Sequence, residues 1–341
     1  MTNENKIGTQ SGNAAASLRF TGKAGEYFSI WIVNVCLSIL TLGIYSAWAK
    51  VRHKKYFYGN TLLNDTAFEY LGDPKAILKG RLIVLGVLAT VSFLTNHFNL
   101  HLLGILYLFA LPYVIIKAAR FNATNSAYRN VRFKFGIGFR PQTGLSRRYI
   151  EGYNQTSQFL ILPVVLVPIT LGLLYPYYVF RKRQFILEHS AFGSTPFSFD
   201  ARPGAFYLAY FKAFLLFLVF LVGSVITLGI GALPFYILFA AYRDAAVGQL
   251  HWKHTCLGAL RFDCSWKTRD LFKLHLLNSL AIILTLGLMV PWAAIRTARY
   301  QLQGLSLRPA SGIDGFVATE LEQVSATGDE AGELLGFDFG L

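Results

Sequence analysis

Residues 34–56 read NVCLSILTLGIYSAWAKVRHKKY, and the interpretation of the whole chain starts from this stretch. An uncharged apolar run breaks at Thr41-Leu42-Gly43, resumes with aromatic residues and then gives way to a dense group of Lys and Arg. Glycine breaks or kinks an apolar helix, and bases with aromatic rings anchor a helix end at a membrane interface. The stretch therefore predicts a membrane helix that ends at a basic surface.

The same pattern recurs along the chain. Residues 278–300 align with residues 34–56 without a gap and share the Asn, the ILTLG segment, Trp-Ala, Arg and Tyr. A third copy contains Thr170-Leu171-Gly172 and Arg181, and two weaker copies begin at Pro112 and Pro234. Self-similarity of this kind is typical of proteins built from repeated units. We predict internal duplication, with rough halves at residues 27–150 and 151–308.

Short pairs of aromatic residues follow the copies. In the first three units we identify Phe68/Tyr70, Phe133/Phe135 and Phe197/Phe199, and in the fourth Leu260/Phe262, which implies an insertion of five residues. Apolar and basic residues alternate over residues 128–135, as in a short strand with one apolar face. We expect short basic, aromatic loops or strands between the helices.

The composition restricts the class of protein. Of 341 residues, 54% are hydrophobic and 15% are charged, against about 25% charged in a typical soluble domain. Three cysteines are too few for a disulfide framework. The net charge of +14 divides into +21 for residues 1–308 and −7 for residues 309–341. Because the bases follow apolar segments, we attribute them to cytoplasmic loops and expect no nucleic-acid partner.

Hydropathy predicts an all-α polytopic membrane protein with about seven transmembrane helices. A polar N-terminal segment covers residues 1–26 and an acidic disordered tail covers residues 309–341. The alternative is that each Thr-Leu-Gly closes a re-entrant helical hairpin, which would raise the count toward ten short helices. The predicted spans are residues 27–49, 76–95, 98–116, 158–180, two within 207–242 that separate near 227–231, and 275–295.

The repeated residues also carry a resemblance. The run from Thr41 to Arg52 with Tyr56, and the later copy from Pro291 to Tyr300, resemble the YjgN-like family of bacterial inner-membrane proteins. The resemblance covers roughly residues 18–320. It implies a multi-pass protein of the cytoplasmic membrane and brings no catalytic or binding residues. One departure is Gln184, which stands where the other copies have a second base.

Candidate contacts for a lipid or solute are polar groups within or just after the apolar segments. His251, His254, Cys256 and Cys264 offer metal-ligand types, but their spacing fits no common zinc site, so we expect neither a metal nor another cofactor. We identify no catalytic constellation and expect no enzyme. The candidate contact residues are Arg52, Arg181, Arg296, Arg299, Lys212, Asn34 and Asn278.

Two functions fit these expectations. The first is a transporter or channel-like protein for a small or lipid-derived solute. Acidic residues are absent from all seven predicted spans, which disfavours coupling to ions. The alternative is a non-enzymatic structural or anionic-lipid-binding membrane protein. The lipid bilayer and anionic phospholipid headgroups are the expected partners, and the sequence leaves the oligomeric state open.

Overall fold

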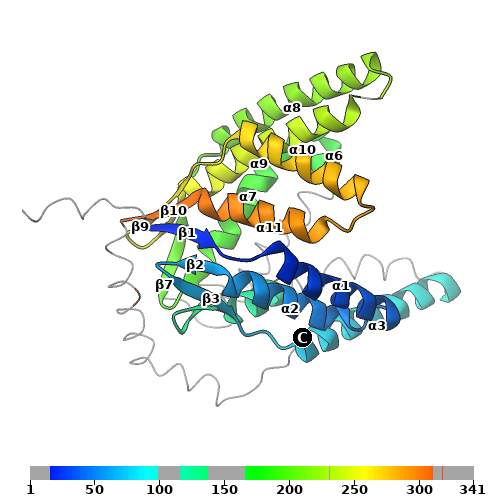
Figure 1. Ribbon diagram of the computed structural model, residues 1–341, viewed down its shortest axis with the longest axis vertical. Helices are drawn as coiled ribbons and strands as arrows, with labels where there is room; N and C mark the ends of the chain where they lie inside the picture. Colours follow the sequence, from blue (N-terminus) through cyan, green and yellow to red (C-terminus); the bar gives the residue numbers. More distant parts are fainter. Residues whose placement is uncertain (1–15, 99–115, 137–165, 230, 310–316, 318–341) are drawn as a thin grey trace, which may run out of the picture.

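The computed structural model describes residues 16–98, 116–136, 166–229, 231–309 and 317 (Figure 1). Within these residues, pairs of helices alternate with short β-hairpins. In chain order the elements are β1 (Ala16–Phe20), α1 (Ala24–Leu40), α2 (Ser46–Gly59), β2 (Thr61–Leu63), β3 (Thr66–Tyr70), α3 (Pro74–Phe98), a helix over residues 116–124, β4 (Ser126–Tyr128), β5 (Val131–Phe135), α6 (Val167–Ile169), α7 (Tyr175–Glu188), β6 (Ser190–Phe192), β7 (Thr195–Phe199), α8 (Pro203–Ile226), α9 (Ala232–Lys253), β8 (Thr255–Leu257), β9 (Leu260–Cys264), α10 (Thr268–Leu284), α11 (Val290–Gln303) and β10 (Leu305–Arg308).

The strands form one closed antiparallel barrel in the order β1-β10-β9-β8-β7-β6-β5-β4-β3-β2. The register repeats at every junction between successive hairpins: Leu18 faces Leu63, Phe68 faces Tyr128, Phe133 faces Phe192, Phe197 faces Leu257, and Phe262 faces Leu307. Residues directly opposite each other on neighbouring strands share one face of the sheet, and both members of each of these five pairs line the inside of the barrel. The barrel therefore has a repeated, apolar interior.

The fifth hairpin is assembled from the two ends of the described chain. Four hairpins connect their strands through two-residue turns, at 64–65, 129–130, 193–194 and 258–259. In the fifth, Leu307 of β10 pairs with Ala16 of β1, as Leu63 pairs with Thr66 in the first. A closed barrel has no free strand edge. The first described strand, β1, is therefore the element that closes the ring.

The helices of each pair are joined by the Thr-Leu-Gly sequence. In the turn between α10 and α11, the Thr285 hydroxyl donates to the Ala281 carbonyl at 2.7 Å and accepts from the Met289 amide at 3.1 Å. The Gly287 amide bonds to the Ile282 carbonyl at 2.8 Å, as in a Schellman end. The same bonds recur around Thr41, Thr170 and Thr227. The hydroxyl thus ties the end of one helix to the start of the next.

The second helix of each pair ends where two side chains satisfy its last carbonyls. In α2, Asn60 donates to the Tyr56 carbonyl and Thr61 to the Phe57 carbonyl, both at 2.8 Å. The last carbonyls of a helix have few partners within it, and here the side-chain donors add to the backbone bond from the Asn60 amide to the Tyr56 carbonyl at 3.1 Å. His254 and Thr255 act in the same way at the end of α9. The helix then passes directly into the first strand of the hairpin.

This architecture corrects the predicted fold class. The chain is not an all-α protein with seven spans, because the described strands close a barrel and Thr-Leu-Gly breaks the predicted spans 27–49 and 275–295 into two helices each. Two described helices, Pro74–His97 and Pro203–Ile226, are long and apolar enough to cross a membrane. The turns at Thr41, Thr170 and Thr285 agree with the alternative prediction that Thr-Leu-Gly joins two helices of a hairpin. The predicted break near residues 227–231 separates α8 from α9.

Several predictions lie partly or wholly outside the described residues. They include the span 98–116 except at its ends, the first part of the span 158–180, and the tail 309–341 apart from its first residue and Val317. The division into halves at residues 27–150 and 151–308 stays a prediction, and so does the origin by duplication.

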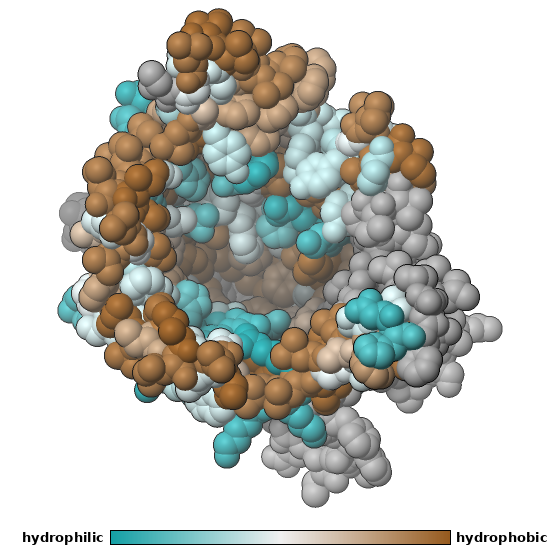
Figure 2. Space-filling view, turned by 90° about the vertical axis from the view of Figure 1, so that its right-hand side faces the viewer, coloured by the Kyte–Doolittle hydropathy of each residue, from teal (hydrophilic) through white to brown (hydrophobic). Residues whose placement is uncertain are grey.

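The barrel lies on one side of the molecule, at the left in Figure 1, and the helical hairpins extend from it toward the opposite side. Seen from the side of the hairpin turns, the helices surround a hollow (Figure 2). Hydrophobic residues dominate the coloured part of the rim, whereas hydrophilic residues gather on the inner wall of the hollow. The molecule has the form of a cup with the barrel as its base.

Candidate binding cavity in the barrel

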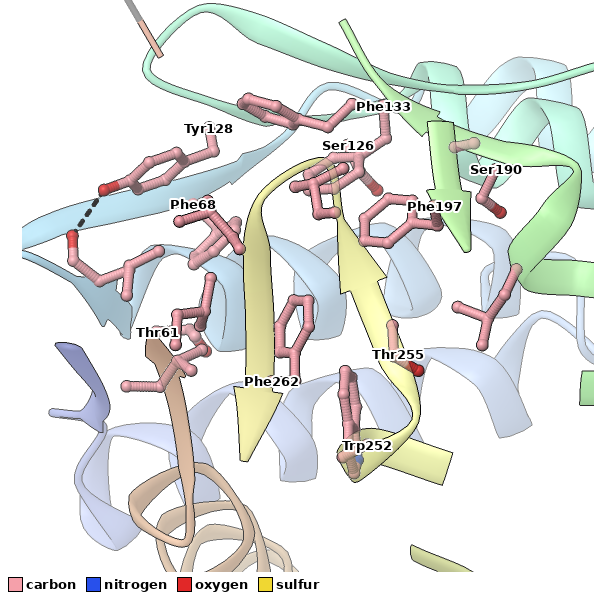
Figure 3. Close-up of a pocket in the computed structure, with 18 of the residues that line it drawn as sticks. Thr61, Phe68, Ser126, Tyr128, Phe133, Ser190, Phe197, Trp252, Thr255 and Phe262 are labelled. Atoms are coloured by element: carbon pink, nitrogen blue, oxygen red, sulfur yellow. Dashed lines mark hydrogen bonds between the residues drawn. The ribbon is translucent and has the colours of Figure 1, made fainter. Parts of the chain in front are cut away.

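A cavity of about 560 Å³ lies inside the barrel. One layer of its wall comes from equivalent positions of the five hairpins, and the four phenylalanines of this layer are labelled in Figure 3. This layer consists of Leu18, Phe68, Phe133, Phe197 and Phe262. The volume falls within the roughly 300–1,000 Å³ typical of small-molecule sites, which are mostly apolar.

The end of the barrel away from the helices is packed. Ala16, Val131 and Leu260 are buried there in one cluster with Val317, and each is no more than 6% exposed. Tyr128 donates from its hydroxyl to the Leu63 carbonyl at 2.7 Å and closes part of the wall (Figure 3). The cavity therefore ends inside the barrel, among buried apolar side chains.

The opposite end of the cavity is bordered by the last turns of the second helices. A layer of hydroxyl side chains follows these turns, formed by Thr61, Ser126, Ser190 and Thr255. Each donates to the carbonyl four residues earlier, so the hydroxyl groups are satisfied by the helices. Polarity thus increases from the barrel toward the hollow between the helices.

Two bases stand next to this border. Lys54 of α2 donates from its ammonium group to the Asn122 side chain, which lines the cavity, and lies 4.6 Å from the Tyr70 ring centre. Arg183 of α7 lies close enough to His251, another lining residue, to influence its titration. Neither base lies within ion-pair distance of a carboxylate among the described residues, although the Asp244 charge partly stabilises the Arg183 cation from further away. Both can therefore attract an anion at the border of the cavity.

Burial changes the titration of these groups. It lowers the pKa of Lys54, to which the neighbouring charge of Lys50 contributes further, and it lowers the pKa of the Arg183 guanidinium. Burial together with Arg183 lowers the pKa of His251 to about 3, so this imidazole is neutral near pH 7. The border of the cavity therefore combines two desolvated cations with a neutral histidine.

The second helices as a group are basic. Across α2, residues 116–124, α7, α9 and α11 there are two acids, Glu188 and Asp244. Asp244 accepts from Arg243 at 2.9 Å and lies 3.5 Å from His275 of α10. The bases on these helices are Lys50, Arg52, Lys54, Lys55, Lys117, Arg120, Arg181, Lys182, Arg183, Arg243, Lys253, Arg296 and Arg299.

Three predicted contact residues occupy equivalent positions. Arg52, Arg181 and Arg296 each stand nine residues before the residue that opens the following strand. Arg52 is exposed, with its guanidinium carbon 6.0 Å from the Tyr45 ring centre. Arg181 donates to the Gln184 side chain at 2.8 Å, so the glutamine that replaces a base is its partner. The structure places the three arginines on separate helices around the hollow.

Asn278 and Arg296 meet in one small network. The Arg296 guanidinium lies 4.5 Å from the Trp292 ring centre and donates to the Asn278 side-chain oxygen at 3.4 Å. Asn278 also donates to the Thr297 hydroxyl at 3.1 Å. Its counterpart Asn34 is buried in α1, and its side-chain oxygen has no partner among the described residues. Asn278 therefore joins the two helices of its hairpin.

Arg299 and Lys212 lie apart from this network. Arg299 donates to the Gly22 carbonyl at 3.0 Å and so links α11 to the segment after β1. Lys212 is exposed on α8. Within the described residues no group of three or more His, Cys, Asp or Glu side chains could hold a metal ion. His254 instead bonds to the Leu250 carbonyl at 3.0 Å.

Sequence reasoning missed the cavity, although it noticed most of the aromatic pairs. The register shows that Phe262 and Cys264, not Leu260 and Phe262, correspond to Phe68 and Tyr70. The sequence did contain a signal of these equivalent cavity positions: Phe68, Phe133, Phe197 and Phe262 recur at intervals of 65, 64 and 65 residues. The fifth member, Leu18, breaks this spacing because it comes from the start of the chain.

Comparison with known proteins gives the family. Residues 15–234 and 224–334 match the family described as bacterial protein of unknown function (DUF898). The chain belongs to this family. It is 31% identical over 140 residues to the inner membrane protein YjgN of Salmonella typhimurium, a match covering 40% of this chain and 35% of that protein. It is 32% identical over 137 residues to the Escherichia coli protein of the same name, covering 36% and 32%.

The matched region spans about a third of the length of these curated relatives. No solved structure matches the chain. The relatives are inner membrane proteins by name, and this agrees with the membrane class that the composition indicated. The multi-pass topology stays a prediction.

Proposed function

We propose that the protein is a non-enzymatic binding protein of the bacterial inner membrane, whose barrel cavity takes the hydrocarbon chain of an anionic amphiphile. The observation that carries this proposal is the apolar cavity of about 560 Å³, bordered by bases on the side of the helices. Burying a hydrocarbon chain there is favourable by about 0.8 kcal/mol for each methylene removed from water.

The charge distribution indicates where the polar end of the ligand would bind. Lys54 and Arg183 stand beside Asn122 and His251 at the border of the cavity. A carboxylate or phosphate beside either base would compensate a partly desolvated cation, and charge-assisted hydrogen bonds to such anions are strong. The ligand would lie with its chain in the barrel and its anionic group toward the hollow.

The geometry favours binding over conduction. Ala16, Val131, Leu260 and Val317 form one buried apolar cluster at the end of the barrel, and this packing supports a binding site over a conducting path. The transporter or channel-like role therefore has less structural support than lipid binding. Arg52, Arg181 and Arg296 remain proposed contacts for the headgroups of surrounding lipids, together with Arg299, Lys212, Asn34 and Asn278 as weaker candidates.

A substitution that fills the cavity tests the proposal. Ala123 lines the cavity, and Ala118 is exposed on the same helix. In detergent, a fluorescent single-chain fatty acid is expected to bind the natural protein and the Ala118→Phe variant with equal affinity. Ala123→Phe should lower the affinity at least about tenfold, because a phenyl ring occupies the space of the chain. Arg183→Gln should weaken binding of the acid but not of the corresponding alcohol.

Equal affinities of Ala123→Phe and Ala118→Phe, with both variants unfolding at the same temperature as the natural protein, would refute the cavity as the binding site. Native mass spectrometry of the protein from the membrane adds a second readout. The natural protein should retain an anionic lipid that Ala123→Phe loses.

A further inference from the structure

In the part of the chain that the structure describes, four helical turns expose a leucine in a conformation that leucine rarely adopts. Leu42, Leu171, Leu228 and Leu286 have φ between 48° and 50°, in the left-handed region. Their side chains are 92–95% exposed. Any residue with a β-carbon is disfavoured there, and Gly or Asn usually takes such a position at a helix end. The choice of leucine therefore needs a reason beyond the turn itself.

Neither the fold nor water supplies that reason. A side chain that is more than 90% exposed gains almost nothing from packing within the protein, and water disfavours its apolar surface. The residues beside the leucines are also apolar and exposed, with Leu40 at 77%, Ile226 at 74% and Leu284 at 81%. Each turn thus forms an apolar tip, and hydrophobic surface dominates the rim of the cup (Figure 2).

Bases follow the tips at a fixed interval. Arg52, Arg181 and Arg296 each come ten residues after the leucine of their own hairpin, on the helix that returns to the barrel. At 1.5 Å per helical residue this interval corresponds to about 10–15 Å. One leaflet of a bilayer has about the same depth, half of a hydrocarbon core of about 30 Å. The spacing fits an apolar tip within the hydrocarbon and an arginine at the headgroups.

We propose that the Thr-Leu-Gly tips are re-entrant membrane anchors, buried in the hydrocarbon of a phospholipid bilayer. The leucine side chains contact acyl chains, the arginines contact the phosphates of the leaflet through which the hairpins enter, and the barrel stays on that same side. The longer hairpin of α8 and α9 carries Leu228 deeper, since its next base, Arg243, follows fifteen residues later. This proposal is independent of the cavity and of its ligand.

Site-directed spin labelling tests the three shorter tips. The background carries Cys36→Ser, Cys256→Ser and Cys264→Ala, and one cysteine is then introduced as Leu42→Cys, Leu171→Cys or Leu286→Cys. The protein is reconstituted in vesicles of phosphatidylethanolamine and phosphatidylglycerol. A nitroxide at each tip should be accessible to oxygen, which concentrates in hydrocarbon, and inaccessible to a water-soluble nickel chelate. A label at the exposed Ser198 of β7 is the control and should meet the nickel chelate.

Each other outcome overturns the proposal. Nickel access at the tips means that they lie in water, on either side of the membrane. Exclusion of both oxygen and nickel means that protein, such as a second copy of the chain, covers them. An impermeant maleimide that labels the tips in sealed vesicles would lead to the first conclusion independently. Because the tips are labelled separately, failure of one variant to fold leaves two others to decide.

Discussion

At the scale of single residues, His251 connects the cavity to the pH dependence of stability. Its ring centre lies 6.2 Å from that of Phe199 and 4.9 Å from that of Trp252, and its Nδ1 atom is buried without a partner among the described residues. Burial is the larger cause of its lowered pKa, and the Arg183 charge adds to it. Folding therefore keeps this imidazole neutral over a pH range in which the unfolded chain would bind a proton.

The sign of the effect follows from this difference. In the unfolded chain a histidine titrates near pH 6.5, and in the folded protein His251 titrates at about 3, so the folded state loses stability as the pH falls below 6.5. Between pH 6.5 and 4.5 the loss should be about 2–3 kcal/mol. His251→Phe should remove this part of the pH dependence. Unfolding followed in detergent at both pH values measures it, and parallel curves for the two proteins would contradict the assignment.

At the scale of elements, the hydroxyl of the Thr-Leu-Gly turn should contribute to the stability of each hairpin. Thr285→Val keeps the shape of the side chain but removes the bonds to the Ala281 carbonyl and the Met289 amide. A typical hydrogen bond contributes about 1 kcal/mol, so the variant should be about 1–2 kcal/mol less stable in denaturant titrations. Thr285→Ser retains the hydroxyl and should lose less than half of that amount. Equal losses would indicate that packing, not hydrogen bonding, explains the threonine.

The elements also show what the sequence could predict. The apolar runs, the breaks at Thr41, Thr170 and Thr285, and the bases that follow are local patterns, and the structure has a helical hairpin at each of these breaks. Hydropathy alone could not tell a helix that crosses from one that turns back, because both present the same apolar run. What distinguishes the hairpin is the left-handed backbone of the Leu-Gly pair, and hydropathy does not reveal backbone conformation.

The barrel was harder to predict from the sequence than the helical hairpins. Its strands have three to five residues, and an alternating pattern stood out only over residues 128–135, where the structure has β5. Its closure depends on the pairing of β1 with β10. Ser17 of β1 pairs with Ser306 of β10, and these residues are far apart in the sequence. Long-range pairing of this kind leaves no local trace. The sequence therefore did not allow the cavity to be predicted, although Phe68, Phe133 and Phe197 each belong to an aromatic pair that the sequence shows.

At the scale of the whole molecule, the closing hairpin predicts that the order of the units can be permuted. Four hairpins are continuous, and the fifth has the same register without a connecting turn. Asn64 and Asp65 both have positive φ, as in the two-residue turns that suit hairpins. A permuted chain that keeps Val317 would begin at Thr66, run to Val317, continue through a flexible Gly/Ser linker into Ala16, and end at Leu63.

Because each strand keeps its neighbours in this permuted chain, it should form the same barrel and bind the fluorescent fatty acid within about threefold of the natural affinity. Deletion of residues 16–20 is the matched opposite case. It removes one strand, exposes the edges of β2 and β10, and takes Leu18 from the cavity wall, so it should abolish binding. If the deletion bound the fatty acid as well as the permuted chain did, the cavity would not require a closed ring, and the role assigned to β1 would fail.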